Sequence, residues 1–233
     1  MPICYSENST GQWKSCESVS ATHRAGRMVP LRAIQGVDMM NIGETRQARI
    51  DLLDRLETRD IRHFGRPLKD HLVGTHDLLE QWGCGHELCL AGLFHSVYGT
   101  RTFKSVTLGT TYRRRLRELI GEYAESLVYI FCMSDRKKLL VDNLSEPFLW
   151  VNHSTGEKTE LSGGVLGDLV ELEAANYVEQ LPFGTVKTAA VFHDMRARFE
   201  IAESRMSGAA RDAVRQAIDD HAHLFAACVD EIS

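Results

Sequence analysis

The sequence predicts an all-α fold with one short β-hairpin, and three observations lead to that prediction. From about Glu44 onward, most segments repeat apolar residues at helical spacing. Strand-like and helix-like segments do not alternate in the way that a parallel sheet requires. One stretch, residues 148–161, instead carries two short β-favouring runs on either side of the turn-like segment 154–157.

Composition limits the classes of protein that this chain can represent. Its 233 residues are 43% hydrophobic and 25% charged, which suffices for one domain with a full core. The net charge of -5 argues against a nucleic-acid partner, which would require a basic surface. The N-terminus lacks the apolar core of a secretory signal, and no run approaches the roughly 18 apolar residues that span a membrane. We therefore expect a cytoplasmic protein without a membrane partner, whose six cysteines are mostly buried free thiols.

The first 40 residues differ from the remainder. They are rich in Ser, Thr, Gly and Asn and show no sustained periodicity, so we expect a mostly disordered N-terminal extension over 1–40. The helical domain then covers 41–233. Met39 and Met40 at this boundary offer an alternative start of translation.

Within the domain, start and stop signals place the helices. Pro67 favours the first turn of a helix, Gly83 favours its end, and Pro182 ends a later one. The expected helices cover about 44–56, 67–82, 86–98, 112–132, 164–180, 185–206 and 209–231. Residues 101–109 are expected to form a loop.

Two histidines stand out among these helices. The segment 86–98 is almost wholly apolar and is therefore expected to be buried, which places His95 inside the core. His71 lies on the preceding helix, and two adjacent antiparallel helices can bring both imidazoles together. A buried imidazole needs a partner. Either a divalent metal lies there, or the two histidines form a polar cluster with each other or with Ser96, Thr75 or Thr100.

The block Leu90-Ala-Gly-Leu-Phe-His95-Ser-Val-Tyr98 resembles the helix ending in Ala-x-Leu-Leu-His-Asp of the HD-domain superfamily, all-helical metal-dependent phosphohydrolases. The resemblance covers about residues 65–180 and is closest to the hydrolase domain of RelA/SpoT-type alarmone enzymes, whose next helix resembles residues 117–128. It implies His71 and His95 as ligands of Fe, Mn or Mg. It also implies a last ligand within 169–176, for which Glu173 is the match and Asn176 a weaker one. Two histidines and one carboxylate are also the ligands of open ferrous sites.

The chain departs from that family at its charged residues. Ser96 stands where the family has the Asp of its His-Asp pair, and Gly99 and Thr100 stand at its acidic pair. A serine hydroxyl is a much poorer metal ligand than a carboxylate. Two functions therefore remain open. One is a divergent metal-dependent enzyme, a hydrolase of a phosphorylated metabolite or an oxygenase. The other is a non-catalytic small-molecule-binding or interaction domain on the same scaffold.

No catalytic residue is assigned, but residues near His95 are candidates for contacting a small-molecule ligand. Tyr and Thr side chains provide directional hydrogen bonds without charge, which suits a polar organic ligand. The predicted ligand-contacting residues are Ser96, Tyr98, Thr100, Arg101 and Asn176.

Other chemistry-bearing groups are given ordinary interpretations. His76 and Asp77 are expected to form an exposed surface pair. Cys84, His86, Cys89 and His95 have a zinc-like spacing, but Cys89 and His95 lie on different faces of one helix, so we do not expect a zinc site. The arginines between 113 and 117 are expected to form a solvated surface, with anion binding as the alternative.

Overall fold

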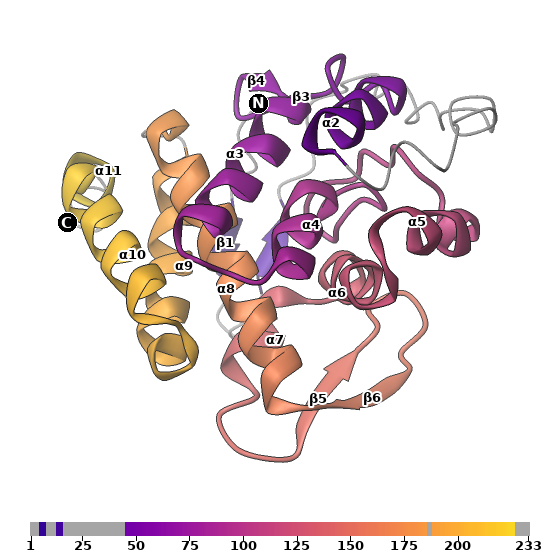
Figure 1. Ribbon diagram of the computed structural model, residues 1–233. Coiled ribbons are helices and arrows are strands. Elements are labelled where there is room, and N and C mark those ends of the chain that lie inside the picture. Colours follow the sequence, from indigo (N-terminus) through magenta and orange to yellow (C-terminus); the bar gives the residue numbers. More distant parts are fainter. Residues whose placement is uncertain (1–4, 8–12, 16–44, 186–187, 227–233) are drawn as a thin grey trace.

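The structure is a computed structural model that describes residues 5–7, 13–15, 45–185 and 188–226. It confirms an all-α fold with a short β-hairpin (Figure 1). The α-helices are α2 (Arg46–Arg55), α3 (Leu68–Gln81), α4 (His86–Phe94), α5 (Arg113–Ile120), α6 (Glu122–Met133), α7 (Arg136–Val141), α8 (Gly163–Gln180), α9 (Ala189–Ala202), α10 (Gly208–Asp220) and α11 (Ala222–Ala226). Short 3-10 turns cover Thr110–Tyr112, Leu181–Phe183 and Glu203–Arg205. The strands form three antiparallel pairs: β1 (Tyr5–Glu7) with β2 (Trp13–Ser15), β3 (Arg62–His63) with β4 (Arg66–Pro67), and β5 (Phe148–Val151) with β6 (Lys158–Leu161).

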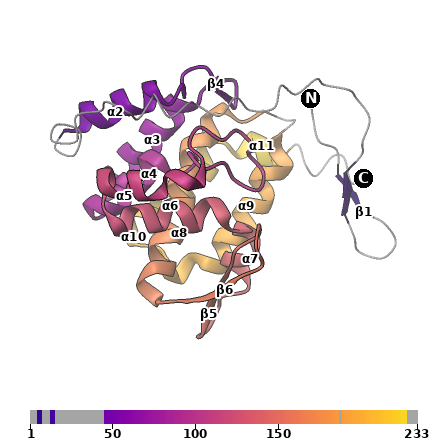
Figure 2. The same ribbon diagram turned by 90° about the vertical axis from the view of Figure 1, so that its right-hand side faces the viewer.

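Helix α8 is the central element of the fold, because two hydrophobic cores meet on it (Figures 1 and 2). One face contributes Leu166, Leu169, Leu172 and Ala175 to a core shared with α2 to α6 and the β5–β6 hairpin. The other face contributes Val170, Ala174 and Tyr177 to a core shared with α9 and α10. Burial of apolar area on both faces is the main force that fixes this helix. Other positions of α8, among them Glu173, Asn176 and Glu179, hold buried polar side chains.

The β5–β6 hairpin has the predicted strands. Phe148 pairs with Leu161 and Val151 with Lys158. Phe148 and Trp150 are buried whereas Leu149 and Val151 are exposed, the alternation expected of a hairpin with one face on the core.

Three helices differ from the sequence prediction. The helix expected over 112–132 is broken at Gly121, where α5 ends. The φ of Gly121 is 91°, a conformation that glycine adopts readily and other residues rarely do. The helix expected over 209–231 ends at Asp220, and α11 follows after His221. The helix expected to reach Tyr98 ends at Phe94, because the chain turns after His95 and the N–H of Gly99 bonds the carbonyl of Ser96 at 2.9 Å. Residues beyond 226 lie outside the described part.

Two elements had no counterpart in the prediction. Helix α7 follows α6 after a break at Ser134 and Asp135. The β3–β4 pair precedes α3, and its strands of two residues are too short to show an alternating pattern. Most of the expected N-terminal extension lies outside the described residues. Within it, the structure describes the β1–β2 pair.

Cys84, Cys89 and Cys132 are free thiols, Cys84 being only partly buried, and the other three cysteines fall outside the described residues. In the part of the chain that the structure describes, every helix is too short or too polar to cross a bilayer.

Candidate functional site

His71 and His95 meet in the interior of the helical domain. His71 lies in the first turn of α3, and His95 is the residue at which α4 ends. Because α3 packs against α4, the two Nε2 atoms lie 3.0 Å apart, and both side chains have 0% relative exposure. The structure thus brings together the two histidines that the sequence singled out.

The other ring nitrogen of each histidine has a fixed partner. Nδ1 of His95 lies 2.7 Å from the carbonyl oxygen of Gly92, which can only accept a hydrogen bond. Nδ1 of His71 lies against a carboxylate oxygen of Glu179 on α8. The second oxygen of Glu179 forms an ion pair with Arg66 on β4. Both imidazoles are therefore oriented through Nδ1, with Nε2 directed at the other ring.

Gly74 provides the space that Glu179 occupies. A Cβ atom on Gly74 would lie 2.7 Å from Oε1 of Glu179, closer than real contacts allow. A larger residue at this position of α3 would displace the carboxylate that orients His71.

Burial determines the protonation states of His71, His95 and Glu179. Desolvation, reinforced by the charge of Arg66, lowers the pKa of His71 to about 3. Complete burial also lowers the pKa of His95 well below its usual range. Desolvation raises the pKa of Glu179 to about 7, although Arg66 opposes that change. Both imidazoles are therefore neutral at physiological pH, which is the form that binds metal ions.

A third histidine borders the pair. His63 on β3 lies with its ring centroid 4.5 Å from that of His71, and its Nε2 is buried with no hydrogen-bond partner in the part of the chain that the structure describes. Desolvation lowers its pKa to about 3, so this imidazole is also neutral. The sequence interpretation missed His63 and Glu179. An available signal for His63 was the tight Phe64-Gly65 turn that leads into α3. We call His63, His71, His95 and Glu179 the histidine cluster.

Glu173, the predicted carboxylate ligand, is buried but bonded elsewhere. Its Oε2 lies 3.0 Å from Nε of Arg136, and Arg198 approaches its other oxygen at 4.0 Å. The carboxylate that contacts His71 is Glu179, further along the same helix. Asn176 lies between them: it donates to Glu173 at 3.2 Å, and its side chain interacts with His71.

The other predicted ligand-contacting residues lie on the chain after His95. Ser96 is buried, and its side chain has no hydrogen bond among the described residues. The hydroxyl of Tyr98 donates to Glu125 at 3.0 Å, away from the histidine cluster. Thr100 accepts a hydrogen bond from the N–H of Phe103 at 3.0 Å, and Arg101 is exposed and paired with Asp135. The structure thus keeps Asn176 beside His71, whereas Tyr98, Thr100 and Arg101 are engaged in other contacts.

The sequence suggested that the arginines between 113 and 117 form a solvated surface, but two of them do not. Arg113 and Arg117 form ion pairs with Glu125, whose side chain is fully buried. Arg114 is 93% exposed and fits the expectation.

The arrangement of hydrogens decides what the histidine cluster can bind. When Glu179 is ionised, both Nδ1 atoms carry the proton and both Nε2 atoms present lone pairs to each other at 3.0 Å, which is repulsive unless a cation lies between them. Two nitrogens that each lie about 2.1 Å from one ion are about 3.0 to 3.4 Å apart for octahedral to tetrahedral angles. The separation of the two Nε2 atoms therefore fits two ligands of one divalent ion.

His76 and Asp77 form a second group of possible ligands. Their ligand atoms and that of Glu80 lie within 4.8 Å of one another, the one group of three that meets this spacing among the described residues. The prediction of an exposed pair was wrong for His76, which is 5% exposed because α3 turns this face toward Gly92 of α4. Asp77 receives two hydrogen bonds from Arg46, at 2.6 and 2.8 Å, so its carboxylate is already neutralised.

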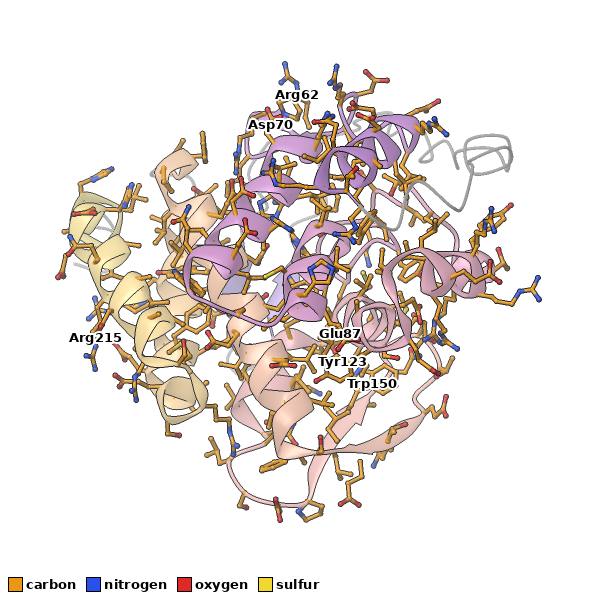
Figure 3. All side chains as sticks on the ribbon, in the orientation of Figure 1. Arg62, Asp70, Glu87, Tyr123, Trp150 and Arg215 are labelled. Atoms are coloured by element: carbon orange, nitrogen blue, oxygen red, sulfur yellow. The ribbon has the colours of Figure 1, made fainter. Side chains whose placement is uncertain are left out.

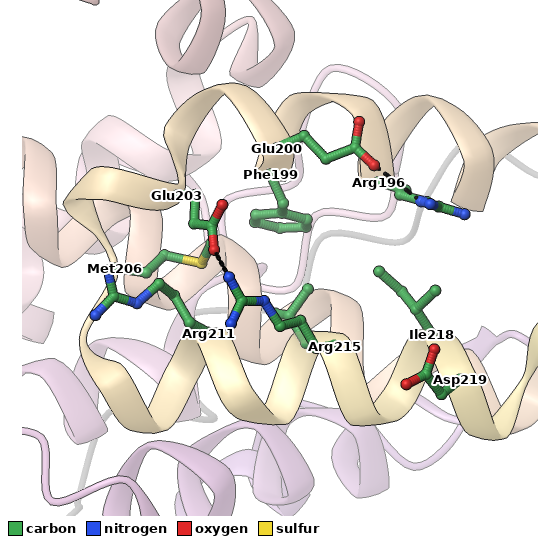
Figure 4. Close-up of a pocket in the computed structure, with 10 residues that line it drawn as sticks. Arg196, Phe199, Glu200, Glu203, Met206, Arg211, Arg215, Ile218 and Asp219 are labelled. Carbon is green, nitrogen blue, oxygen red and sulfur yellow. Dashed lines mark hydrogen bonds and ion pairs between the residues drawn. The ribbon is translucent and has the colours of Figure 1, made fainter.

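A shallow groove lies elsewhere, between α9 and α10 (Figure 4). It encloses about 280 Å³ over Phe199, Met206 and Val214. Ion pairs such as Glu203 with Arg215 and Arg196 with Glu200 border it. It is not lined by any residue of the histidine cluster.

Comparison with known proteins gives one finding. A family model described as a domain of unknown function (DUF6817) matches residues 52–136, roughly a third of the chain. The matched segment contains His63, His71 and His95 but ends before Glu179. No curated protein and no solved structure matches the chain.

Proposed function

We propose that this protein is a metal-dependent enzyme, a divergent relative of the HD-domain superfamily, whose metal ligands include His71 and His95. The observation that carries the proposal is the pair of neutral, buried Nε2 atoms that face each other at 3.0 Å while both Nδ1 atoms are held by acceptors. Metal-binding histidines are commonly oriented in this way, through a carboxylate or a backbone carbonyl on the second nitrogen.

The chain's own residues have distinct tasks in this proposal. A bound divalent ion would supply positive charge to polarise a water molecule or a substrate oxygen. Glu179 fixes the ring of His71, and Arg66 holds Glu179. The apolar residues around the cluster, such as Phe94 and Phe131, exclude bulk water and so strengthen electrostatic interactions there.

A different arrangement of hydrogens supports the second candidate, a non-catalytic binding domain. The pKa of Glu179 lies at about 7, so near neutrality its carboxyl group is protonated for part of the time. A protonated Glu179 donates to His71, His71 donates through Nε2 to His95, and His95 donates to Gly92. That chain satisfies Glu179, His71 and His95 without an ion, and these two histidines then serve the fold alone.

Metal binding distinguishes the two candidates. The experiment is to purify the protein free of metal, titrate it with Co²⁺, and record stoichiometry and visible absorption, followed by competition with Mn²⁺, Fe²⁺ and Zn²⁺. We expect one equivalent of Co²⁺ to bind the native protein and none to bind His95→Gln. A His153→Gln variant is the control, because His153 is an exposed hairpin residue.

A native protein that binds less than a small fraction of one equivalent of every ion would contradict the enzyme proposal. Equal Co²⁺ binding by the native protein and His95→Gln would also contradict it, because the ion would then lie elsewhere, for instance at His76 and Asp77.

A further inference from the structure

The β3–β4 hairpin carries two buried nitrogens that the described residues leave without a partner. Its turn, Phe64-Gly65, has positive φ at both positions, 46° and 82°, as in the tight two-residue turns that match the twist of a hairpin. In the resulting register His63 lies directly opposite Arg66. Side chains of directly opposed residues point to the same face of the hairpin.

Each of these two residues has one unsatisfied nitrogen. Nε2 of His63 and Nε of Arg66 are both buried, and neither has a hydrogen-bond partner among the described residues. A buried polar atom without a partner costs about 1–3 kcal/mol, so such atoms are uncommon and require an explanation. Glu171 and Arg198 also contain one such atom each, but in the described part of the chain only His63 and Arg66 are paired across a hairpin.

Both side chains are held firmly. The ring of His63 contacts those of Phe64, His71 and Phe103, with centroids 5.0, 4.5 and 4.9 Å away. The guanidinium of Arg66 lies 3.7 Å from the ring centroid of Phe183 while its Nη2 binds Glu179. Rigid donors lose little conformational entropy when a ligand arrives.

The donors of this region suit an anionic ligand. Arginine offers only donors, and its charge is permanent. The positive charges of Arg66 and Arg136 both act on the rings of His63 and His71. Arg136 is itself paired with Glu173, and Arg66 with Glu179. A divalent ion at His71 and His95 would add positive charge beside the hairpin and strengthen this preference.

We propose that Nε2–H of His63 and Nε–H of Arg66 bind an oxyanion, the carboxylate or phosphate group of the small molecule on which the enzyme acts. The inference rests on the proposed function only in assigning this group to the substrate of the same site. The hairpin is then the recognition element, and the histidine pair holds the ion beside it.

The test measures binding of inorganic phosphate and of acetate to the full chain. Side-chain ¹⁵N resonances of labelled histidine are recorded during each titration, with and without one equivalent of Co²⁺ bound. We expect saturable shifts at His63 with at least one of the two anions. Phosphate alone indicates a phosphate ligand, acetate alone a carboxylate ligand, and both a site that accepts either oxyanion.

Two variants remove one donor each. His63→Phe keeps the ring, and Arg66→Lys keeps the positive charge opposite Glu179 but removes the Nε donor. We expect each to weaken anion binding, measured by calorimetry, by about tenfold or more, which corresponds to one charge-assisted hydrogen bond. Arg62→Gln is the matched control, since Arg62 lies on the same hairpin but at the molecular surface (Figure 3), and it should bind as the native protein does.

The possible failures are distinct. Absence of any shift at His63, or equal anion affinity in the native protein and both folded variants, would overturn the proposal. Loss of Co²⁺ from His63→Phe would also overturn it, by making His63 a metal ligand instead. If the native protein binds anions through His63 and Arg66 but no metal ion, the proposed enzyme fails and the oxyanion site stands. Circular dichroism of each variant confirms that it is folded.

Discussion

Two buried groups of ionisable residues lie in the same core, and only one of them is complete. The Glu125 cluster consists of Glu125, Tyr98, Arg113 and Arg117. Its carboxylate accepts hydrogen bonds from the Tyr98 hydroxyl at 3.0 Å, from Arg113 at 2.7 and 3.0 Å, and from Arg117 at 3.0 and 3.3 Å. The histidine cluster instead leaves Nε2 of His63 without a partner among the described residues and places two neutral imidazole nitrogens opposite each other.

From this difference we propose that the Glu125 cluster serves the fold and that the histidine cluster binds a ligand. A fully hydrogen-bonded buried network makes the structure rigid and has no unused donor or acceptor for another molecule. A buried network with unused donors and lone pairs lowers the stability of the fold, and a ligand that forms the missing hydrogen bonds restores that stability. We therefore expect mutations of the Glu125 cluster to change stability, and mutations of the histidine cluster to change binding.

The largest expected effect is on stability. Glu125→Gln should lower the free energy of unfolding by about 3 kcal/mol, because the partly exposed Arg113 and Arg117 lose the charge of the fully buried carboxylate that pairs with them. Urea denaturation followed by circular dichroism measures the change. Glu122→Gln is the control, since its side chain is 81% exposed, and it should stay within about 0.5 kcal/mol of the native protein. Equal losses in the two variants would show that the Glu125 cluster does not support the fold.

The next effect is on binding. His95→Gln should lower the affinity for Co²⁺ by more than about a hundredfold, since removing a ligand should exceed the 10- to 100-fold loss seen when only its orienting partner is changed. The same variant should unfold in a two-state transition near that of the native protein. A variant that unfolds and for that reason loses the ion would place His95 with the Glu125 cluster, as a residue of the fold.

Gly74→Ala should produce an intermediate effect on both quantities. In an open helix position this change stabilises a protein by up to about 1 kcal/mol. Here the new methyl group would meet Oε1 of Glu179, so we expect a loss of about 1–3 kcal/mol and an affinity for Co²⁺ lower by about tenfold. Gly164→Ala is the control, because a Cβ there has its nearest contact at 4.0 Å. Unchanged Co²⁺ affinity in Gly74→Ala would show that the position of Glu179 does not matter for the ion.

The smallest expected effect is the change of the Glu125→Gln stability difference at low pH. Burial alone would raise the pKa of Glu125, but hydrogen bonds from Arg113 and Arg117 outweigh it and hold the pKa below its ordinary value of 4.5. The native protein therefore keeps this contribution above pH 4.5 and loses it as the pH falls through the lower folded value. The stability gap between the native protein and Glu125→Gln should narrow below pH 4.5, by up to about 1.4 kcal/mol per pH unit. Urea denaturation between pH 7 and 3 measures it, and a constant gap would contradict the assignment.

The sequence was sufficient where a side chain's surroundings are local. The apolar run of α4 indicated that His95 is buried, and alternation with a turn located β5 and β6 within their actual bounds. The sequence was insufficient where the packing of distant helices determines which of two nearby residues makes a contact. Glu173 and Glu179 both lie on α8, and only the packing of α8 against α3 determines that Glu179 contacts His71. His63 and Arg66 were missed because strands of two residues have no measurable period.

The central position of α8 also bears on how the protein is made. Arg66 and Glu179 are separated by 113 positions, and His71 and Glu179 by 108. On the ribosome the three imidazoles therefore emerge long before the carboxylate that orients one of them. During that interval the nascent chain cannot complete the histidine cluster, so the proposed metal site can form only after α8 has left the exit tunnel. For the same reason, a fragment that stops near residue 136 would contain the histidines and still lack the site.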